Sequence, residues 1–210
     1  MKYLKIIILF MGTLSSFCFA QEMSENEKML AIQKVSIIDR PVVMVGMGLT
    51  RLLNDDYYIG AMYLDEKVEY DKTADFFSVK VARRMQFKFA SKISISARSF
   101  KRKLVESLRI NNSRKDINAQ KAELAQFLKF FSGSYKKGDE LSFDYHHTFG
   151  TRVILNGRII GQVENSHDLY NLLVKIWVGE RPPTSKFKSG ILGNNDGDYA
   201  IELLRQYINL

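Results

Sequence analysis

The spacing of apolar residues changes near Ser96, and this change constrains the fold more than any other feature of the chain. Over residues 77–89 apolar and polar residues alternate, which predicts one long β-strand buried on one face, with a bulge at Arg83-Arg84 where the phase shifts. From Ala97 to Leu108 the apolar residues fall at helical spacing instead, and Ser96 is a suitable N-cap. The chain therefore combines a sheet with helices.

The rest of the chain also combines predicted strands with predicted helices. Asn156-Gly157 stands between two apolar runs, which indicates a β-hairpin because the favoured turn needs positive φ at both positions. Further strands are expected over residues 31–45, 59–64 and 141–145, and further helices over 122–131, from near Ser166 to Trp177, and over 198–208. We predict one α+β domain, with an antiparallel sheet and helices packed on one side.

Residues 1–20 have the features of a cleavable secretory signal peptide. Lys2 and Lys5 precede an apolar run that is too short to cross a bilayer, which takes about 20 residues, and Ala20 is a suitable cleavage point. Two alternatives are an uncleaved N-terminal anchor and lipidation of Cys18. We expect a mature chain of residues 21–210, without a transmembrane segment, that is periplasmic or secreted.

The composition of the mature chain excludes several classes of site. Its lack of cysteine excludes disulfides, thiol nucleophiles and thiolate metal sites. The formal charge of +8 becomes +6 without Lys2 and Lys5, and the basic residues are dispersed, so we expect no nucleic-acid partner. Weak association with an anionic membrane surface stays possible, and we expect a monomer.

The histidines and glycines do not form a recognisable cofactor site. His146 and His147 are adjacent in a predicted strand and should point to opposite faces, while His167 begins a predicted helix elsewhere. Gly46 and Gly48 lack the third glycine of a dinucleotide-binding motif. We therefore expect neither a metal nor a cofactor.

A series of short strings resembles the chalcone isomerase-like family, in its bacterial exported branch. The match spans roughly residues 35–193 and is carried by the order and spacing of the strings rather than by any one of them. The strings are Gly46-Met-Gly48-Leu-Thr-Arg51, Tyr58-Ile-Gly-Ala-Met-Tyr63-Leu64, Phe127-Leu128, Lys137-Gly138-Asp139, Gly150-Thr151, Asn156-Gly157, Ile176-Trp177-Val178-Gly179 and Pro182 to Gly193.

The resemblance implies an open-faced β-sandwich, in which a curved antiparallel sheet carries a helical layer and an elongated apolar cleft lies between them. Plant members of the family close a chalcone into a flavanone, whereas other members lack that activity and some bind fatty acids in the cleft. Arg51 matches the cleft arginine that holds the substrate phenolate in the enzymes. Its alternative role is an ion pair with Asp55 or Asp56 at a strand end.

Other positions depart from the enzymes. Tyr58 takes the place of the strand threonine, and the helical tyrosine, lysine and asparagine correspond to Phe100, Lys103 and Ser107, whose spacing puts them on one helix face. Phe100 cannot donate a hydrogen bond, so the network that polarises the ketone is broken unless Tyr58 replaces it. Tyr63 should lie on the opposite strand face from Tyr58, and Lys103 has a solvent-facing alternative.

These observations predict an exported, non-catalytic protein that binds a fatty acid or similar small amphiphile in an apolar cleft, with Arg51 at its polar end. One alternative is an intramolecular lyase or isomerase acting on an enone-like substrate. Another is a partner-binding protein of the cell envelope, which would expose an apolar patch instead of a deep pocket.

Overall fold

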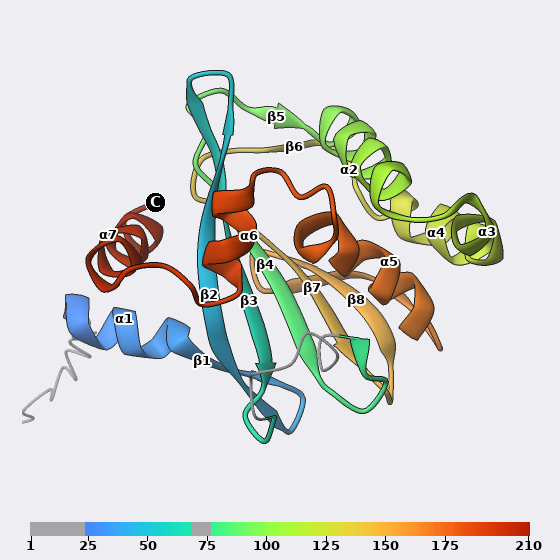
Figure 1. The fold of residues 1–210 in the computed structure, drawn as a ribbon, viewed down its shortest axis with the longest axis horizontal. Helices are drawn as coiled ribbons and strands as arrows, with labels where there is room; N and C mark the ends of the chain where they lie inside the picture. The colour runs from blue at the N-terminus through green and yellow to red at the C-terminus, as the bar shows by residue number, and fades with distance from the viewer. Residues whose placement is uncertain (1–23, 69–76) are drawn as a thin grey trace, which may run out of the picture.

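A curved sheet of seven antiparallel strands forms the centre of the molecule (Figure 1). The computed structural model describes residues 24–68 and 77–210. The strand order is β1-β2-β3-β4-β7-β8-β9, so the strands of this sheet pair in the same order in which they occur along the chain. Their bounds are β1 Lys34–Ile37, β2 Arg40–Leu52, β3 Asp55–Asp65, β4 Arg83–Phe89, β7 Glu140–His146, β8 Gly150–Leu155 and β9 Arg158–Val163.

One long insertion separates β4 from β7. It contains a small two-stranded sheet, β5 Ile95–Ser96 with β6 Ser134–Tyr135, and between these strands the helices α2 Ala97–Asn111, α3 Arg114–Ala119 and α4 Lys121–Lys129. After β9 the chain adds α5 His167–Val178, α6 Ser185–Ile191 and α7 Gly197–Ile208. The first described helix, α1 Glu25–Gln33, precedes β1.

The helices α2, α4, α5 and α6 cover one face of the sheet, as expected (Figure 1). Aromatic rings dominate the core beneath them; the Phe87 and Trp177 ring centroids, for example, lie 4.9 Å apart. These rings occupy the space in which the family resemblance implies an elongated cleft. They belong to Tyr58, Phe87, Phe89, Phe100, Phe127, Phe131, Phe143 and Trp177.

A second, smaller helical layer lies on the other face, which differs from the expectation of helices on one side only. The helices α1 and α7 pack there against β2 and β3, and Met47, Tyr63 and Tyr207 are buried in this second core. Tyr58 and Tyr63 point to opposite faces, as predicted. Within residues 24–68 and 77–210, none of the helices is long and apolar enough to span a bilayer.

Small residues let α6 lie directly on the sheet. Gly48 and Gly60 face Phe187 of α6, and a Cβ atom at either glycine would come within 2.7 Å of the Phe187 ring. The Phe187 ring can lie this close to the sheet only because both strands have a glycine, which has no side chain, at the contact. The glycines of the Gly46-Met-Gly48 string are therefore packing residues, which explains them without a cofactor.

The prediction of a continuous strand over 31–45 is wrong in its first part. Residues up to Gln33 are helical because Ser24 and Glu27 form a capping box, in which Ser24 N donates to Glu27 Oε2 at 2.7 Å and Glu27 N to Ser24 Oγ at 3.3 Å. The chain then turns at Ile38, whose φ is 57°, so the extended region is divided into β1 and β2.

The prediction of one long strand over 77–89 with a bulge at Arg83-Arg84 is also wrong. β4 begins at Arg83, and both arginines pair with β3 in regular register. Their side chains alternate in the ordinary way: Arg83 lies in the core between the rings of Tyr145 and Tyr170, and Arg84 points to the other face. The predicted signal peptide, residues 1–20, lies outside the described residues.

Candidate functional site

A cavity opens at the end of the β2–β3 hairpin. Its walls are residues 52–57 of the hairpin and, across from them, Ser91, Ile93 to Ser96 and Ser99, which lead from β4 into α2. The cavity has a volume of about 580 Å³, which is within the range of small-molecule sites. We call it the turn pocket.

A β-bulge brings Tyr57 into this pocket. Thr50 pairs with Tyr58 and the next residue, Arg51, pairs with Asp56, so Tyr57 is an extra residue in β3. Because the bulge disturbs the usual alternation, Tyr57 and Tyr58 lie on the same side of the sheet with ring centroids 5.1 Å apart. A regular strand would have sent one of them to the opposite face.

The Tyr57 hydroxyl is the unusual atom of the pocket. The residue is only 6% exposed, and its Oη has no hydrogen-bond partner within the described ranges 24–68 and 77–210. Burial raises the pKa of Tyr57 well above its ordinary value, and the neighbouring Tyr58 and Tyr135 raise it further, so the group stays protonated and able to donate. Leaving a buried hydroxyl without a partner costs free energy, so this atom is a candidate for a hydrogen bond to a polar ligand atom.

Tyr135 adds a second hydroxyl of this kind nearby. Its Oη also has no partner among the described residues, and burial raises its pKa to about 12. Phe89 links the two tyrosines: its ring is stacked on Tyr135 at 4.7 Å and lies edge-on to Tyr57 at 6.4 Å. Phe100 packs against the same pair, Phe89 and Tyr135, so the floor of the region is aromatic.

The N-terminus of α2 borders the pocket. Ser96 caps the helix by accepting a hydrogen bond from Ser99 N at 3.1 Å, and both serines line the pocket. The first turn of α2 contains no acidic residue that would offset the positive end of the helix dipole. On the other wall, Ser91 Oγ lies 3.3 Å from Asp55 Oδ2 and 2.9 Å from Ile93 O. The site thus joins apolar walls to a few polar residues, among them Tyr57 and the two serines at the N-terminus of α2.

The structure places Arg51 away from this pocket. Its side chain is 66% exposed, its Nε donates to Asp56 Oδ1 at 2.8 Å, and it lines a shallow pocket with Lys186 and Tyr199 beside α7. The ion pair with Asp56 is thus the arrangement found, and Arg51 points to solvent on the α7 side of the sheet. A cation there does not reach a ligand between the sheet and the main helical layer.

Of the other predicted residues, two lie in the core and two lie half-buried on α2. Tyr58 is buried and its hydroxyl accepts a hydrogen bond from Trp177 Nε1 at 3.2 Å. Phe100 is buried in the aromatic core, while Lys103 and Ser107 are half-buried and do not line the turn pocket. Tyr58 and Phe100 are therefore both part of the main core, whereas Arg51, Lys103 and Ser107 are not.

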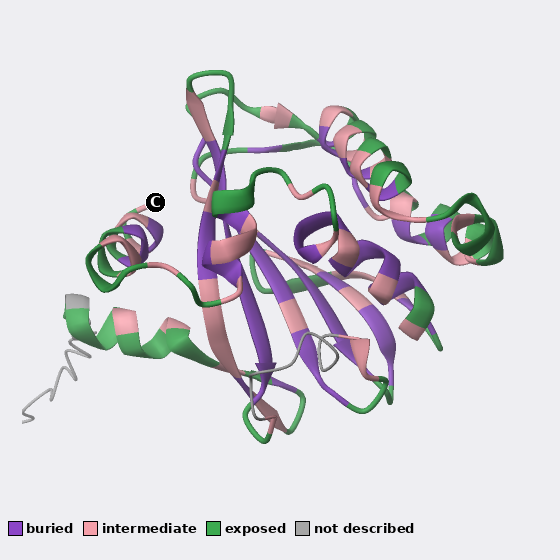
Figure 2. Ribbon diagram, in the orientation of Figure 1, coloured by how far each residue is buried: buried purple, intermediate pink, exposed green. Residues whose placement is uncertain are grey.

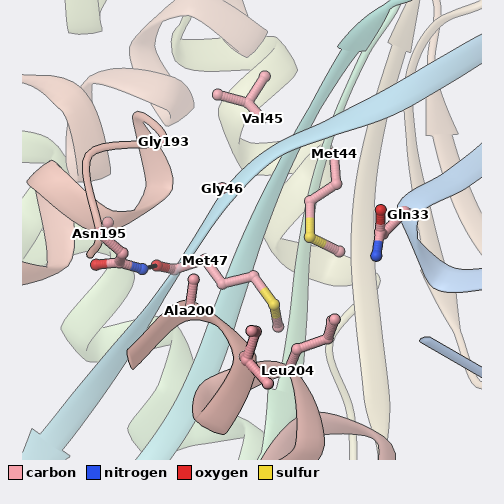
Figure 3. A pocket seen from close by; sticks show the side chains of 11 residues that line it. Gln33, Met44, Val45, Gly46, Met47, Gly193, Asn195, Ala200 and Leu204 are labelled. Carbon is pink, nitrogen blue, oxygen red and sulfur yellow. Dashed lines mark hydrogen bonds between the residues drawn. The ribbon is translucent and has the colours of Figure 1, made fainter. Parts of the chain in front are cut away.

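A second pocket lies on the other side of β2, next to α7 (Figure 3). It has a volume of about 280 Å³, and Met44, Met47 and Leu204 form its apolar surface. Asn195 Nδ2 donates to Met47 O at 2.9 Å across it, as the dashed line in Figure 3 shows. We call it the α7 pocket; it is smaller than the turn pocket, and its polar groups include this completed bond.

The fold defines a class of protein: a curved antiparallel sheet with its main helical layer on one face, here with a pocket at the end of the β2–β3 hairpin. The chain belongs to the chalcone isomerase-like family, whose sequence model matches residues 25–193. The predicted family and fold class are thus confirmed, and α7 lies beyond the matched residues.

A solved structure supports the fold. The crystal structure of an Arabidopsis thaliana fatty-acid binding protein superimposes with a TM-score of 0.56 at 14% sequence identity, covering 82% of this chain and 93% of that chain. Among curated protein sequences, none matches this chain.

Proposed function

We propose that this protein binds a fatty acid or a similar small amphiphile in the turn pocket and does not catalyse a reaction on it. The observation that carries the proposal is the Tyr57 hydroxyl, which is buried at the wall of a cavity of about 580 Å³ and has no partner among the described residues. The family and the structural similarity to a fatty-acid binding protein support the same class of ligand.

The polar end of the ligand belongs between Tyr57 and the start of α2. A carboxylate there accepts a charge-assisted hydrogen bond from Tyr57 Oη and lies at the positive end of a 15-residue helix. The apolar part contacts Leu52, Ile93 and Ile95, which line the same pocket. The pocket could extend toward the centre of the sheet, to hold a longer ligand, only if the side chain of Phe100 or its aromatic neighbours moved.

The enzymatic alternative receives less support from these positions. A cyclisation of the family type needs a cation and hydrogen-bond donors around one substrate. Arg51 points to the α7 side of the sheet, Phe100 offers no donor, and Tyr58 is buried and does not line the turn pocket. We therefore propose binding rather than turnover.

We also propose that the protein acts outside the cytoplasm, in the periplasm or secreted, after removal of residues 1–20. The support is the sequence pattern of Lys2, Lys5, the apolar run and Ala20. Expression of the full chain in a bacterium, followed by mass measurement of the product, tests this directly: a mature N-terminus at Gln21 is expected, and an intact Met1 in the cytoplasmic fraction would contradict it.

Titration of the purified protein with long-chain fatty acids tests the binding proposal. We expect a one-to-one complex by native mass spectrometry and displacement of a fluorescent fatty-acid analogue from it. The methyl ester of the same fatty acid should bind at least about tenfold more weakly, because it lacks the charge that strengthens the hydrogen bond. Failure to bind any chain length, or equal binding of acid and ester, would count against the proposed headgroup site.

A further inference from the structure

Apolar side chains are exposed at the mouth of the turn pocket. Leu53 is 94% exposed, Ile93 is 75% exposed and Leu52 is 42% exposed, and all three line the same pocket. Figure 2 shows the tip of the β2–β3 hairpin in the colour of exposed residues at the top of the view. We call these three residues the mouth patch. Single exposed apolar residues are common, but a group around a pocket entrance indicates a binding surface.

Leu53 stands at the tip of the hairpin, with a φ of 57° in the left-handed region, where glycine or asparagine is favoured. Its side chain buries almost none of its surface, so it adds little apolar burial to the fold and is free to contact another surface.

Basic side chains border the mouth patch. Lys92 directly precedes Ile93, and Arg98 and Arg102 are exposed one turn apart on α2, starting at the pocket edge. The acidic side chains at the mouth are engaged within the protein, since Asp56 pairs with Arg51 at 2.8 Å and Asp55 lies within hydrogen-bond distance of Ser91 Oγ. Apolar side chains with exposed basic side chains on one flank match the interface of a membrane that contains anionic lipids.

We infer that the mouth patch docks the protein onto a bilayer containing anionic phospholipids. Leu52, Leu53 and Ile93 enter the interface, and the basic side chains lie over the headgroups. The docked orientation turns the turn pocket toward the membrane, so an amphiphile passes between bilayer and pocket without crossing water. This role for docking rests on the proposed function of the pocket, whereas the docking itself does not require a bound ligand.

The chain offers a matched control for the tip of the patch. Ile38 is also an exposed apolar residue with a φ of 57°, but it lies at the β1–β2 turn, at the other end of the 13-residue strand β2. At about 3.3 Å per residue, the two turns are about 40 Å apart. Asparagine tolerates this backbone conformation, so Leu53→Asn and Ile38→Asn should both fold and differ only in which end of the sheet they alter.

Flotation with lipid vesicles tests the inference. The probes are vesicles of phosphatidylcholine alone and vesicles with about one-third phosphatidylglycerol, free of fatty acid, at low and high salt. We expect binding to the anionic vesicles that weakens with salt, an approximately tenfold loss for Leu53→Asn, and no loss for Ile38→Asn. The double variant Arg98→Glu/Arg102→Glu should bind at least about 25-fold more weakly, at about fivefold per basic residue. All variants share one N-terminus, so a retained leader does not affect the comparison.

Three results would overturn the inference: no binding to anionic vesicles, equal binding to both kinds of vesicle, or equal loss in Leu53→Asn and Ile38→Asn. The wild-type protein is titrated in parallel with fatty acid in the absence of vesicles. Vesicle binding without fatty-acid binding would reject the proposed function and keep docking, and the reverse result would reject docking alone.

Discussion

Replacement of Tyr57 by phenylalanine should stabilise the ligand-free protein and weaken ligand binding. The substitution removes only the hydroxyl, which is buried and unpartnered among the described residues. An unsatisfied buried polar group costs about 1–3 kcal/mol, so Tyr57→Phe should raise the free energy of unfolding by about 1–2 kcal/mol. For a chain of this size that corresponds to an increase in Tm of about 2–4 °C per kcal/mol.

The effect on affinity should have the opposite sign. A hydrogen bond to a charged ligand oxygen contributes about 1.5–3 kcal/mol, so the dissociation constant for a fatty acid should rise about 10- to 100-fold. Thermal unfolding without ligand and calorimetric titration with ligand measure the two effects separately. A site that pairs this hydroxyl only when occupied predicts this combination of higher stability and lower affinity.

Tyr63→Phe is the matched control. The Tyr63 hydroxyl donates to Ile32 O at 2.9 Å on the other face of the sheet. Its removal leaves that carbonyl unpaired, so Tyr63→Phe should lower the free energy of unfolding by about 1 kcal/mol and leave fatty-acid affinity unchanged. The reasoning is refuted if Tyr57→Phe lowers the Tm as Tyr63→Phe does, or if both variants bind the ligand equally well.

Three further predictions concern other parts of the molecule. Phe100→Ala should lower the free energy of unfolding by about 3–4 kcal/mol and shift binding toward longer alkyl chains, because it opens the aromatic core beneath the pocket. Denaturant unfolding measures the stability, and a series of fatty acids of different chain length measures the preference. An unchanged chain-length preference would contradict this prediction. Arg51→Ala should leave fatty-acid affinity unchanged and have little effect on stability, because its pair with Asp56 is exposed to solvent. A large loss of affinity by calorimetry would show that Arg51 takes part in ligand binding. Burial and the neighbouring His147 lower the pKa of His146, so the unfolded state takes up the proton first as pH falls below about 6.5, and stability should fall there by at most about 1.4 kcal/mol per pH unit. Unfolding curves at several pH values should show this slope reduced in His146→Gln, and an unchanged slope in that variant would contradict the prediction.

Elements with a strong local pattern could be predicted from the sequence. The helix α2 begins after Ser96 as its apolar spacing indicates, and the Asn156-Gly157 turn has φ values of 48° and 77°, as the hairpin signal requires. The same holds for α5 and α7, whose bounds agree closely with the predicted ranges. In each case a few neighbouring residues determine the structure, so no long-range information is needed.

The helix α1 was missed although its signal is present. Ser24 and Glu27 have the spacing of a capping box, but the apolar residues that follow favoured a strand. The bulge expected at Arg83-Arg84 is absent because Arg83 packs between aromatic rings and behaves as a core residue despite its charge. Periodicity alone does not distinguish such an arginine from a break in the pattern.

The turn pocket could not be predicted from the sequence, for a physical reason. Tyr57 enters the turn pocket only because of the bulge between the Thr50–Tyr58 and Arg51–Asp56 pairs. A bulge is a property of strand register, which two strands determine together, and adjacent tyrosines in one strand give no local sign of it. The family resemblance likewise could not show that Arg51 points toward α7.

A crystal structure of the protein with palmitate tests the central claim most directly. The account predicts density for the ligand in the turn pocket, with a carboxylate oxygen within hydrogen-bond distance of Tyr57 Oη and near the N-terminus of α2. Density in the α7 pocket beside Met44 and Leu204, or a turn pocket that stays free of ligand under saturating palmitate, would contradict it.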